Sequence, residues 1–145
     1  MTALRPFAFL GLAVLAACHA SPEQLPGNRE DHHPYAGIAA AETVHAAGTE
    51  PFWSADVAGG RLVYRTPDNQ KGEAVPVSRF AGRGGVSFSG ELAAGAATLA
   101  IMPGRCSDGM SDRSYPFDAL LEIDGQIHKG CAWTDRHPAS GPAKP

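Results

Sequence analysis

Between residues 42 and 134, apolar and polar side chains alternate with a period of two, and turn-forming residues interrupt the alternation. This period is typical of half-buried strands, whereas an amphipathic helix would repeat every 3.6 residues. The clearest alternating runs are 61–65, 86–92 and 97–102, and the Gly59-Gly60 and Asp124-Gly125 pairs are hairpin turns. The sequence therefore predicts an all-β fold of about eight short strands, in a small antiparallel barrel or a sandwich.

The other predicted strands and the domain limits follow from the same pattern. Further short strands are expected over 43–46, 52–57, 74–80, 115–123 and 126–133. The segment 74–80 is expected at a sheet edge, because Pro76 has no N–H to donate to a ladder. Residues 18–41, with three prolines and mixed charge, predict a flexible tether, and 135–145 predict an unstructured tail. The folded domain is then 42–134.

Residues 1–17 have the layout of an export signal. Arg5 precedes an apolar run over 7–17, which is too short for the roughly 20 residues that span a bilayer. Leu15-Ala16-Ala17-Cys18 resembles the lipobox of bacterial lipoproteins, which implies cleavage before Cys18 and a lipid on its sulfur and its amine. His19 follows Cys18, and the resemblance then favours the outer membrane, facing the periplasm. The alternative is an ordinary signal peptide cut after Ala20.

Charge and cysteine content narrow the class further. Residues 1–17 hold one of the 12 Lys and Arg residues and none of the 15 Asp and Glu residues, so the mature chain carries about −4. It has no basic run, which argues against nucleic acid as a partner. With Cys18 lipidated, Cys106 and Cys131 remain, and an oxidising compartment predicts a disulfide between them. The alternative is a thiol nucleophile, Cys106 or Cys131, served by His128.

Two segments carry a family resemblance. Residues 48–53 (GTEPFW) and 106–113 (CSDGMSDR), with the later Cys131, resemble the signatures of a family of uncharacterised proteobacterial lipoproteins and periplasmic proteins. The resemblance covers about residues 45–133 and implies an exported, cysteine-bridged β-domain without a known activity. In size, lipobox and strand content the chain is also similar to small barrel lipoproteins that inhibit C-type lysozymes. That likeness is one of architecture, and it assigns no inhibitory residue.

The first segment is expected to shape one end of the domain. Phe52 and Trp53 are neighbours in a strand and so point to opposite faces, one into the core and the other to the rim. Glu50 is expected to pair with Arg105 or Arg113, and a carboxylate that lines a pocket is the alternative.

The second segment predicts a polar loop. Ser107, Asp108, Ser111 and Asp112 supply several oxygens, but their spacing is not that of an EF-hand, so a structural turn is favoured over a cation site. A hydrolase using Ser111, Asp112 and His128 is an alternative, although no nucleophile-elbow pattern precedes the serine.

The leading functional hypothesis is a cell-envelope lipoprotein with a non-catalytic binding domain and no cofactor or metal. Its partner would be a protein or a glycan, and one candidate is a wall-active enzyme whose acidic cleft would receive Arg105 and Arg113. A hydrolase is the first alternative. The second is a weak copper or zinc binder using Asp31-His32-His33. The expected binding face consists of Glu50, Phe52, Trp53, Arg105, Ser107, Asp108, Ser111, Asp112 and Arg113.

Overall fold

The computed structural model describes residues 32–142, and within them it contains nine strands and no helix. The predicted all-β class is confirmed. The export signal, Cys18 and the tether up to residue 31 lie outside the described residues. In the described part of the chain, no helix is long and apolar enough to cross a membrane. The strands are β1 (Val44–Thr49), β2 (Phe52–Ala58), β3 (Arg61–Thr66), β4 (Asn69–Pro76), β5 (Ser78–Ala81), β6 (Val86–Leu92), β7 (Gly95–Cys106), β8 (Tyr115–Ile123) and β9 (Gln126–Thr134).

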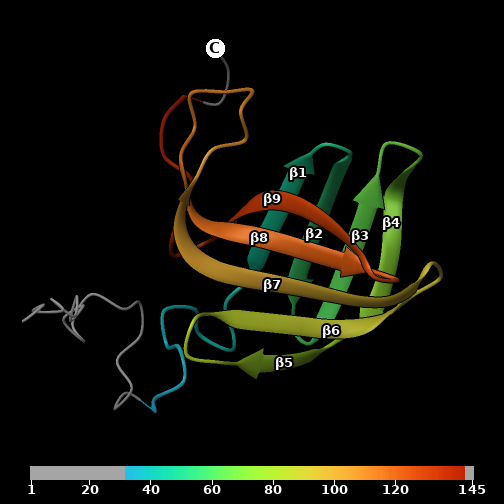
Figure 1. Cartoon of the computed structure of the whole chain (residues 1–145), viewed down its shortest axis with the longest axis horizontal. Coiled ribbons are helices and arrows are strands. Elements are labelled where there is room, and N and C mark those ends of the chain that lie inside the picture. Colours follow the sequence, from blue (N-terminus) through green and yellow to red (C-terminus); the bar gives the residue numbers. More distant parts are fainter. Residues whose placement is uncertain (1–31, 143–145) are drawn as a thin grey trace, which may run out of the picture.

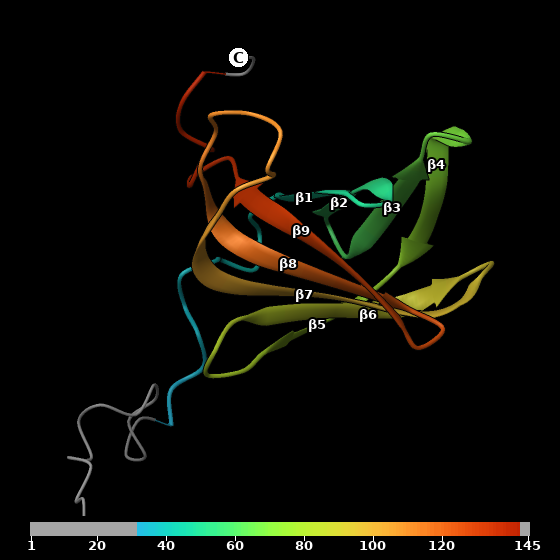
Figure 2. The ribbon, with the colours of Figure 1, turned by 45° about the horizontal axis from the view of Figure 1, so that its top comes forward.

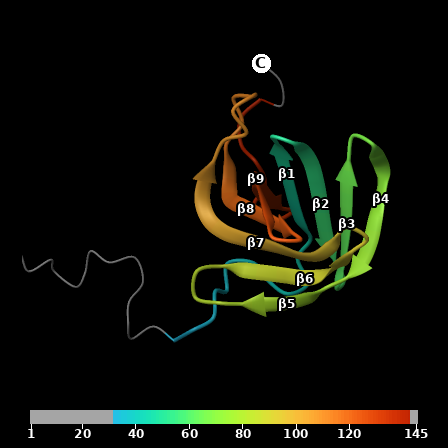
Figure 3. The same ribbon diagram turned by 45° about the vertical axis from the view of Figure 1, so that its right-hand side comes forward.

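The strands form one antiparallel sheet in the order β4-β3-β2-β1-β9-β8-β7-β6-β5. The sheet curls until β4 lies against β6, which gives a nearly closed barrel (Figures 1 and 3). The sequence left a barrel and a sandwich open, and the barrel is the form observed. Closure of this kind shortens the exposed edges that an open sheet would present.

The barrel is filled by the inward-facing half of each alternating strand. Val44, Leu62, Leu99, Ile101 and Leu121 are each at most 1% exposed. Burying a side chain of this size contributes about 1.5–3 kcal/mol. Five further buried positions hold alanine, and these are Ala46, Ala55, Ala97, Ala119 and Ala132.

Trp53 is the largest side chain inside the barrel, and two glycines make room for it. A Cβ at Gly48 would lie 2.2 Å from the indole Nε1, and one at Gly130 would lie 2.8 Å from Cζ2. Trp53 is 4% exposed and Phe52 is 54% exposed, so their predicted placement on opposite faces is confirmed. The Trp53 Nε1 has no hydrogen-bond partner among the described residues.

The expected edge strand over 74–80 is two strands in the structure. The chain leaves β4 after Pro76, and the amide of Val77 donates to the carbonyl oxygen of Gly60 at 2.9 Å before β5 begins. The first half of β4 (residues 69–73) was not predicted, because its sequence NQKGE has no apolar alternation. It pairs with β3 and is largely solvent-exposed, so the pairing needs no apolar face.

Parts of the expected tether and tail pack onto the barrel. Ile38 is 1% exposed and belongs to the core cluster. The C-terminal segment 135–142 runs beside the loop between β7 and β8 (Figure 2), where the backbones of Ser114 and Ser140 bond to each other at 2.9 Å in both directions. The described fold therefore extends beyond residues 42–134 on both sides.

Candidate binding groove

Two neighbouring strands separate in the middle of the sheet. β1 and β9 pair from Val44–Thr134 to Ala47–Cys131, where their ladder ends. Beyond that point the end of β1 pairs only with β2, and the segment Gln126–Gly130 pairs only with β8. Figure 1 shows β1 and β9 running in different directions from this junction.

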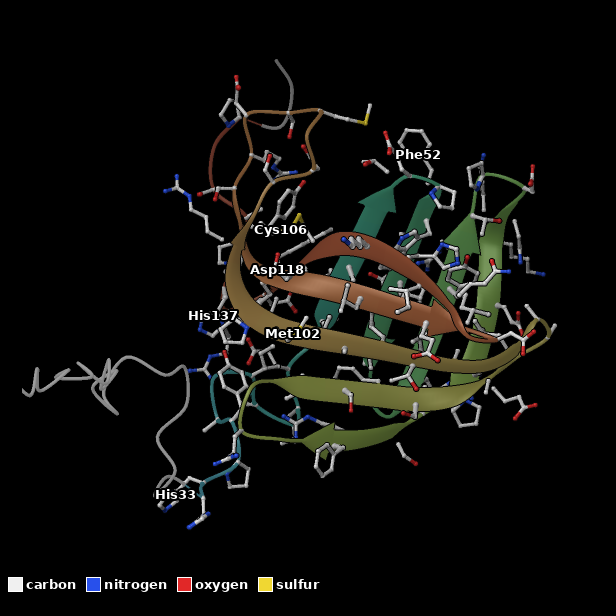
Figure 4. The ribbon with its side chains drawn as sticks, in the orientation of Figure 1. His33, Phe52, Met102, Cys106, Asp118 and His137 are labelled. Carbon is white, nitrogen blue, oxygen red and sulfur yellow. A yellow bond between two sulfur atoms is a disulfide. The ribbon has the colours of Figure 1, made fainter. Side chains whose placement is uncertain are left out.

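A groove of about 770 Å³ opens where the strands separate. Its floor crosses the outer face of the barrel, along a row in which Ala47 faces Cys131, Cys131 faces Asp118, and Asp118 faces Met102. Asp118, Met102 and Cys106 are labelled on this side in Figure 4. The lining residues are Ala47, Gly48, Thr49, Glu50, Met102, Cys106, Ser107, Asp108, Asp118, Ala119, Leu120, Ile127, Lys129, Gly130 and Cys131.

Three charged side chains of the groove lack partners in the described part of the chain, whereas the fourth, Asp108, is hydrogen-bonded. Within residues 32–142, the side chains of Glu50, Asp118 and Lys129 make no ion pair and no hydrogen bond. The predicted pairing of Glu50 with Arg105 or Arg113 is therefore wrong, and the alternative, a carboxylate that lines a pocket, describes its position. Apolar surface beside unpaired charges of both signs suits a ligand that is itself amphipathic.

The predicted disulfide fixes one side of the groove. Cys106 and Cys131 are joined, with their Cα atoms 5.5 Å apart, so the end of β7 is bound covalently to β9. Cys131 is 3% exposed. The bond holds the start of the loop 107–114 against the groove floor.

Asp108 organises that loop. Its Oδ1 accepts hydrogen bonds from the amides of Met110 and Ser111, both at 2.9 Å. Its Oδ2 accepts from the Ser111 hydroxyl at 2.8 Å and from the Tyr115 hydroxyl at 3.1 Å. These bonds, the one from the Met110 amide first, lower the pKa of Asp108 to about 2. The carboxylate is thus fully occupied in shaping the turn, as the sequence predicted for this loop.

The loop also contacts the turn between β1 and β2. The Thr49 hydroxyl donates to the backbone oxygen of Asp108 at 3.4 Å. The two sequence motifs, distant along the chain, therefore meet, and residues 48–50 of one line the same groove as residues 106–108 of the other.

Other predicted site residues lie outside the groove. Phe52 and Trp53 line a separate hollow of about 270 Å³ on the other side of the β1–β2 turn. The Arg105 Nε donates to the Ser114 hydroxyl at 3.3 Å, and the guanidinium of Arg113 lies 6.0 Å from the centre of the Tyr115 ring. The structure therefore brings together only part of the expected face.

The residues of the hydrolase alternative are not assembled. The Ser111 hydroxyl donates to Asp108 and accepts from the Arg113 amide at 3.3 Å. In the described part of the chain, no hydrogen bond joins Ser111 to Asp112 or His128. Residues 32–142 also contain no group of three or more His, Cys, Asp and Glu side chains arranged to hold a metal ion. Asp31 lies outside the described residues.

Sequence reasoning missed the floor of the groove, which Met102, Asp118, Leu120, Ile127 and Lys129 help to form. A signal for it exists in the alternation of the strands. Leu120 and Ile127 occupy outward positions of β8 and β9, and Ile127 is 62% exposed. Large apolar residues in phase with the solvent face of a strand indicate a covered or ligand-binding surface.

Comparisons of the chain with protein-family models, with curated proteins and with solved structures found no match.

Proposed function

We propose that this chain is an exported, lipid-anchored protein of the cell envelope, and that its barrel is a non-catalytic binding module for a partner protein. The observation that carries the proposal is the groove of about 770 Å³, which combines apolar side chains with three charged side chains that have no partner among the described residues. The wall of the groove is held by the disulfide and by Asp108, so it is shaped before the ligand arrives.

The chemistry of the loop supports binding over hydrolysis. A general base needs a free lone pair and a pKa near the working pH. Asp108 accepts four hydrogen bonds and has a pKa of about 2, and the Ser111 hydroxyl already donates to it. The same bonds suit a rigid recognition loop.

The envelope location rests on the export signal and on Cys18. Mass spectrometry of the protein from membranes is expected to find Cys18 as the first residue, carrying a lipid. The variant Cys18→Ser is expected to lose the lipid and to be released from the membrane fraction. A mature protein that begins after Ala20, or a Cys18 without a lipid, would contradict this part of the proposal.

The proposed partners include wall-active enzymes. We now place their contact surface in the groove, and no longer at Arg105 and Arg113. Arg113 is folded against Tyr115 and Arg105 is bonded to Ser114, so these side chains are engaged within the domain. Neither arginine lines the groove, whereas Glu50, Asp118 and Lys129 do.

The test uses the chain from His19 to Pro145 and lysozymes of the chicken, goose and invertebrate types, with binding measured by calorimetry and inhibition by wall lysis. The variant Leu120→Glu places a charge on the groove floor, and Ala96→Glu places one on the exposed outer surface of β7, outside the groove. Binding that Leu120→Glu abolishes and Ala96→Glu spares supports the proposal. Binding that survives Leu120→Glu places the contact elsewhere, and no binding to any of these lysozymes removes them as partners.

A further inference from the structure

We propose that the turn between β5 and β6 (residues 82–85), with the exposed Phe80 beside it, contacts the bilayer that holds the lipid of Cys18. This inference rests on the lipid anchor of the proposed function, and it concerns a corner of the barrel that the groove does not include. It starts from Phe80, which at 69% is the most exposed large apolar side chain in the described part of the chain.

The segment that precedes β1 is bound to this same corner. The Tyr35 amide donates to the carbonyl oxygen of Gly82 at 2.7 Å, and the Arg79 Nη2 donates to the carbonyl oxygen of Ile38 at 2.7 Å. The Phe80 ring lies beside Gly82 as well, because a Cβ on that glycine would be 3.3 Å from the ring carbon Cε1. The chain that leads back toward the anchor therefore leaves the barrel next to Phe80.

The short connection to the anchor keeps this corner near the membrane. Tyr35 stands 17 residues after Cys18, so the chain between them spans at most about 60 Å. A link of this length gives a second contact an effective concentration on the order of millimolar. An apolar contact too weak to hold a free protein on a bilayer is therefore occupied once the lipid is in place.

The side chains of the corner suit a bilayer that contains anionic lipids. Residues 78–85 (SRFAGRGG) contain two arginines and no acidic residue, and residues 32–39 (HHPYAGIA) contain no acidic residue either. The whole chain, in contrast, has a net charge of −3. An aromatic ring beside positive charge binds at the boundary between headgroups and acyl chains, where apolar groups enter about 5–10 Å deep. Phe80 is the group that enters.

Contact at this corner leaves the groove loop in the aqueous phase. In Figures 1, 2 and 3 the β5–β6 turn lies on the lower side of the barrel, whereas the loop between β7 and β8 lies at the top. β6 and β7 separate β5 from β8 in the sheet. With Phe80 in the bilayer, the loop 107–114 faces away from the membrane and is accessible to a partner protein.

The experiment uses the mature lipidated protein, purified from membranes and returned to vesicles of phosphatidylethanolamine and phosphatidylglycerol. The acyl chains carry bromine, which quenches nearby fluorophores. A fluorescent label is attached at Gly84→Cys, where an added Cβ meets no atom within 4 Å, or at Met110→Cys, an exposed position of the loop 107–114. Bromine is expected to reduce the emission about twofold or more at position 84, because the turn lies at the acyl-chain boundary, and to leave it unchanged at position 110.

A charge at position 80 tests the side chain itself. In the Gly84→Cys protein, Phe80→Glu is expected to abolish the quenching, because a carboxylate does not enter the acyl region. Met110→Glu also replaces an exposed large apolar side chain, and as the matched control it is expected to preserve the quenching. Both positions are exposed, and the urea midpoints of the two variants check that the fold is unchanged.

The outcomes separate this inference from the lipid anchor. A protein that floats with the vesicles but shows no quenching at position 84 overturns the bilayer contact and leaves the anchor in place. Equal quenching at positions 84 and 110, or quenching that survives Phe80→Glu, also overturns the contact. A mature chain that does not float with the vesicles contradicts the anchor and this inference together.

Discussion

Two carboxylates, Asp108 and Glu42, each hold together an irregular part of the molecule, and they do so in different ways. Asp108 takes all its side-chain partners from residues 110–115. Glu42 takes its partners from Ala39 on one side of the chain and from Thr134 and His137 on the other. The first bonds order one loop, whereas the second join the two segments that flank the barrel.

The surroundings of Glu42 explain its wider reach. Its side chain is 2% exposed. Its Oε1 accepts from the Thr134 hydroxyl and lies 3.2 Å from the His137 Nδ1, and its Oε2 accepts from the Ala39 amide at 2.9 Å. Desolvation raises the pKa of Glu42, but the hydrogen bonds from Thr134, Ala39 and His137 outweigh it, so the pKa lies below its ordinary value.

The difference teaches that a well-bonded carboxylate stabilises only what its bonds connect. The Asp108 bonds join residues close in sequence, so they replace hydrogen bonds that the loop 107–114 would otherwise make with water. The Glu42 bonds join residues more than 90 positions apart, so they hold the segment before β1 against the segment after β9. Loss of Asp108 is therefore expected to be felt in the loop, and loss of Glu42 in the whole fold.

The largest effect is expected from the disulfide, which gives the Asp108 loop its covalent link to β9. In the double variant Cys106→Ala/Cys131→Ala, loss of a cross-link with a sequence separation of 25 is expected to lower the free energy of unfolding by about 3.5 kcal/mol. Urea unfolding measures it, with the reduced unchanged chain as the control. A loss below about 1 kcal/mol would show that the loop is held by its hydrogen bonds alone.

The next largest effect is expected for Glu42→Ala. Removal of the carboxylate takes the Glu42 acceptor from Thr134, which is fully buried, and leaves it only the Nδ1 of His137, 3.2 Å away. The expected loss of unfolding free energy is about 2–3 kcal/mol. Glu91→Ala, at an exposed position of β6, is the control and is expected to change stability by less than about 0.5 kcal/mol. Equal stabilities for the two variants would show that the Glu42 bonds between the two flanking segments do not stabilise the fold.

A smaller effect is expected when Glu42 is protonated instead of removed. Its pKa is lowered in the folded state, so its contribution is complete above the ordinary value of 4.5 and is lost as the pH falls through the folded pKa. The difference in stability between the unchanged chain and Glu42→Gln is expected to be constant above pH 6 and to shrink below about pH 4.5. A difference that grows in acid would contradict the lowered pKa.

The sequence predicted what depends on local pattern. Alternation identified most strands, and the compartment implied by the export signal predicted the Cys106–Cys131 bond that the structure contains. The sequence did not predict the groove, which lies where β1 and β9 separate. Alternation within a strand does not indicate at which residue its pairing with a neighbouring strand ends. The sequence misplaced Glu50 for the same reason, since the partners of a turn residue depend on which strands flank it in space.

The Glu42 contacts were equally invisible in the sequence. Residues 39–42 and 134–137 are separated by the whole barrel, and each belongs to a stretch without periodicity. The partners of Asp108, in contrast, lie within seven residues of it, and the sequence predicted a turn there. Prediction from sequence thus succeeded for the local carboxylate and failed for the long-range one.

The smallest effect on global stability is expected for Asp108→Asn, and it sharpens the comparison most. An amide has one acceptor oxygen, so it cannot accept all four hydrogen bonds that the carboxylate accepts. The amide protons of Met110 and Ser111 are expected to exchange faster with solvent, while the urea midpoint stays that of the unchanged chain. Because the pKa of Asp108 is lowered from 3.8 to about 2, the loop in the unchanged chain is expected to stay protected at pH 3.5 and to lose protection as the pH falls through about 2. If Asp108→Asn shifts the urea midpoint as far as Glu42→Ala does, the distinction between a local and a long-range carboxylate fails, because the loop would then be part of the cooperative core.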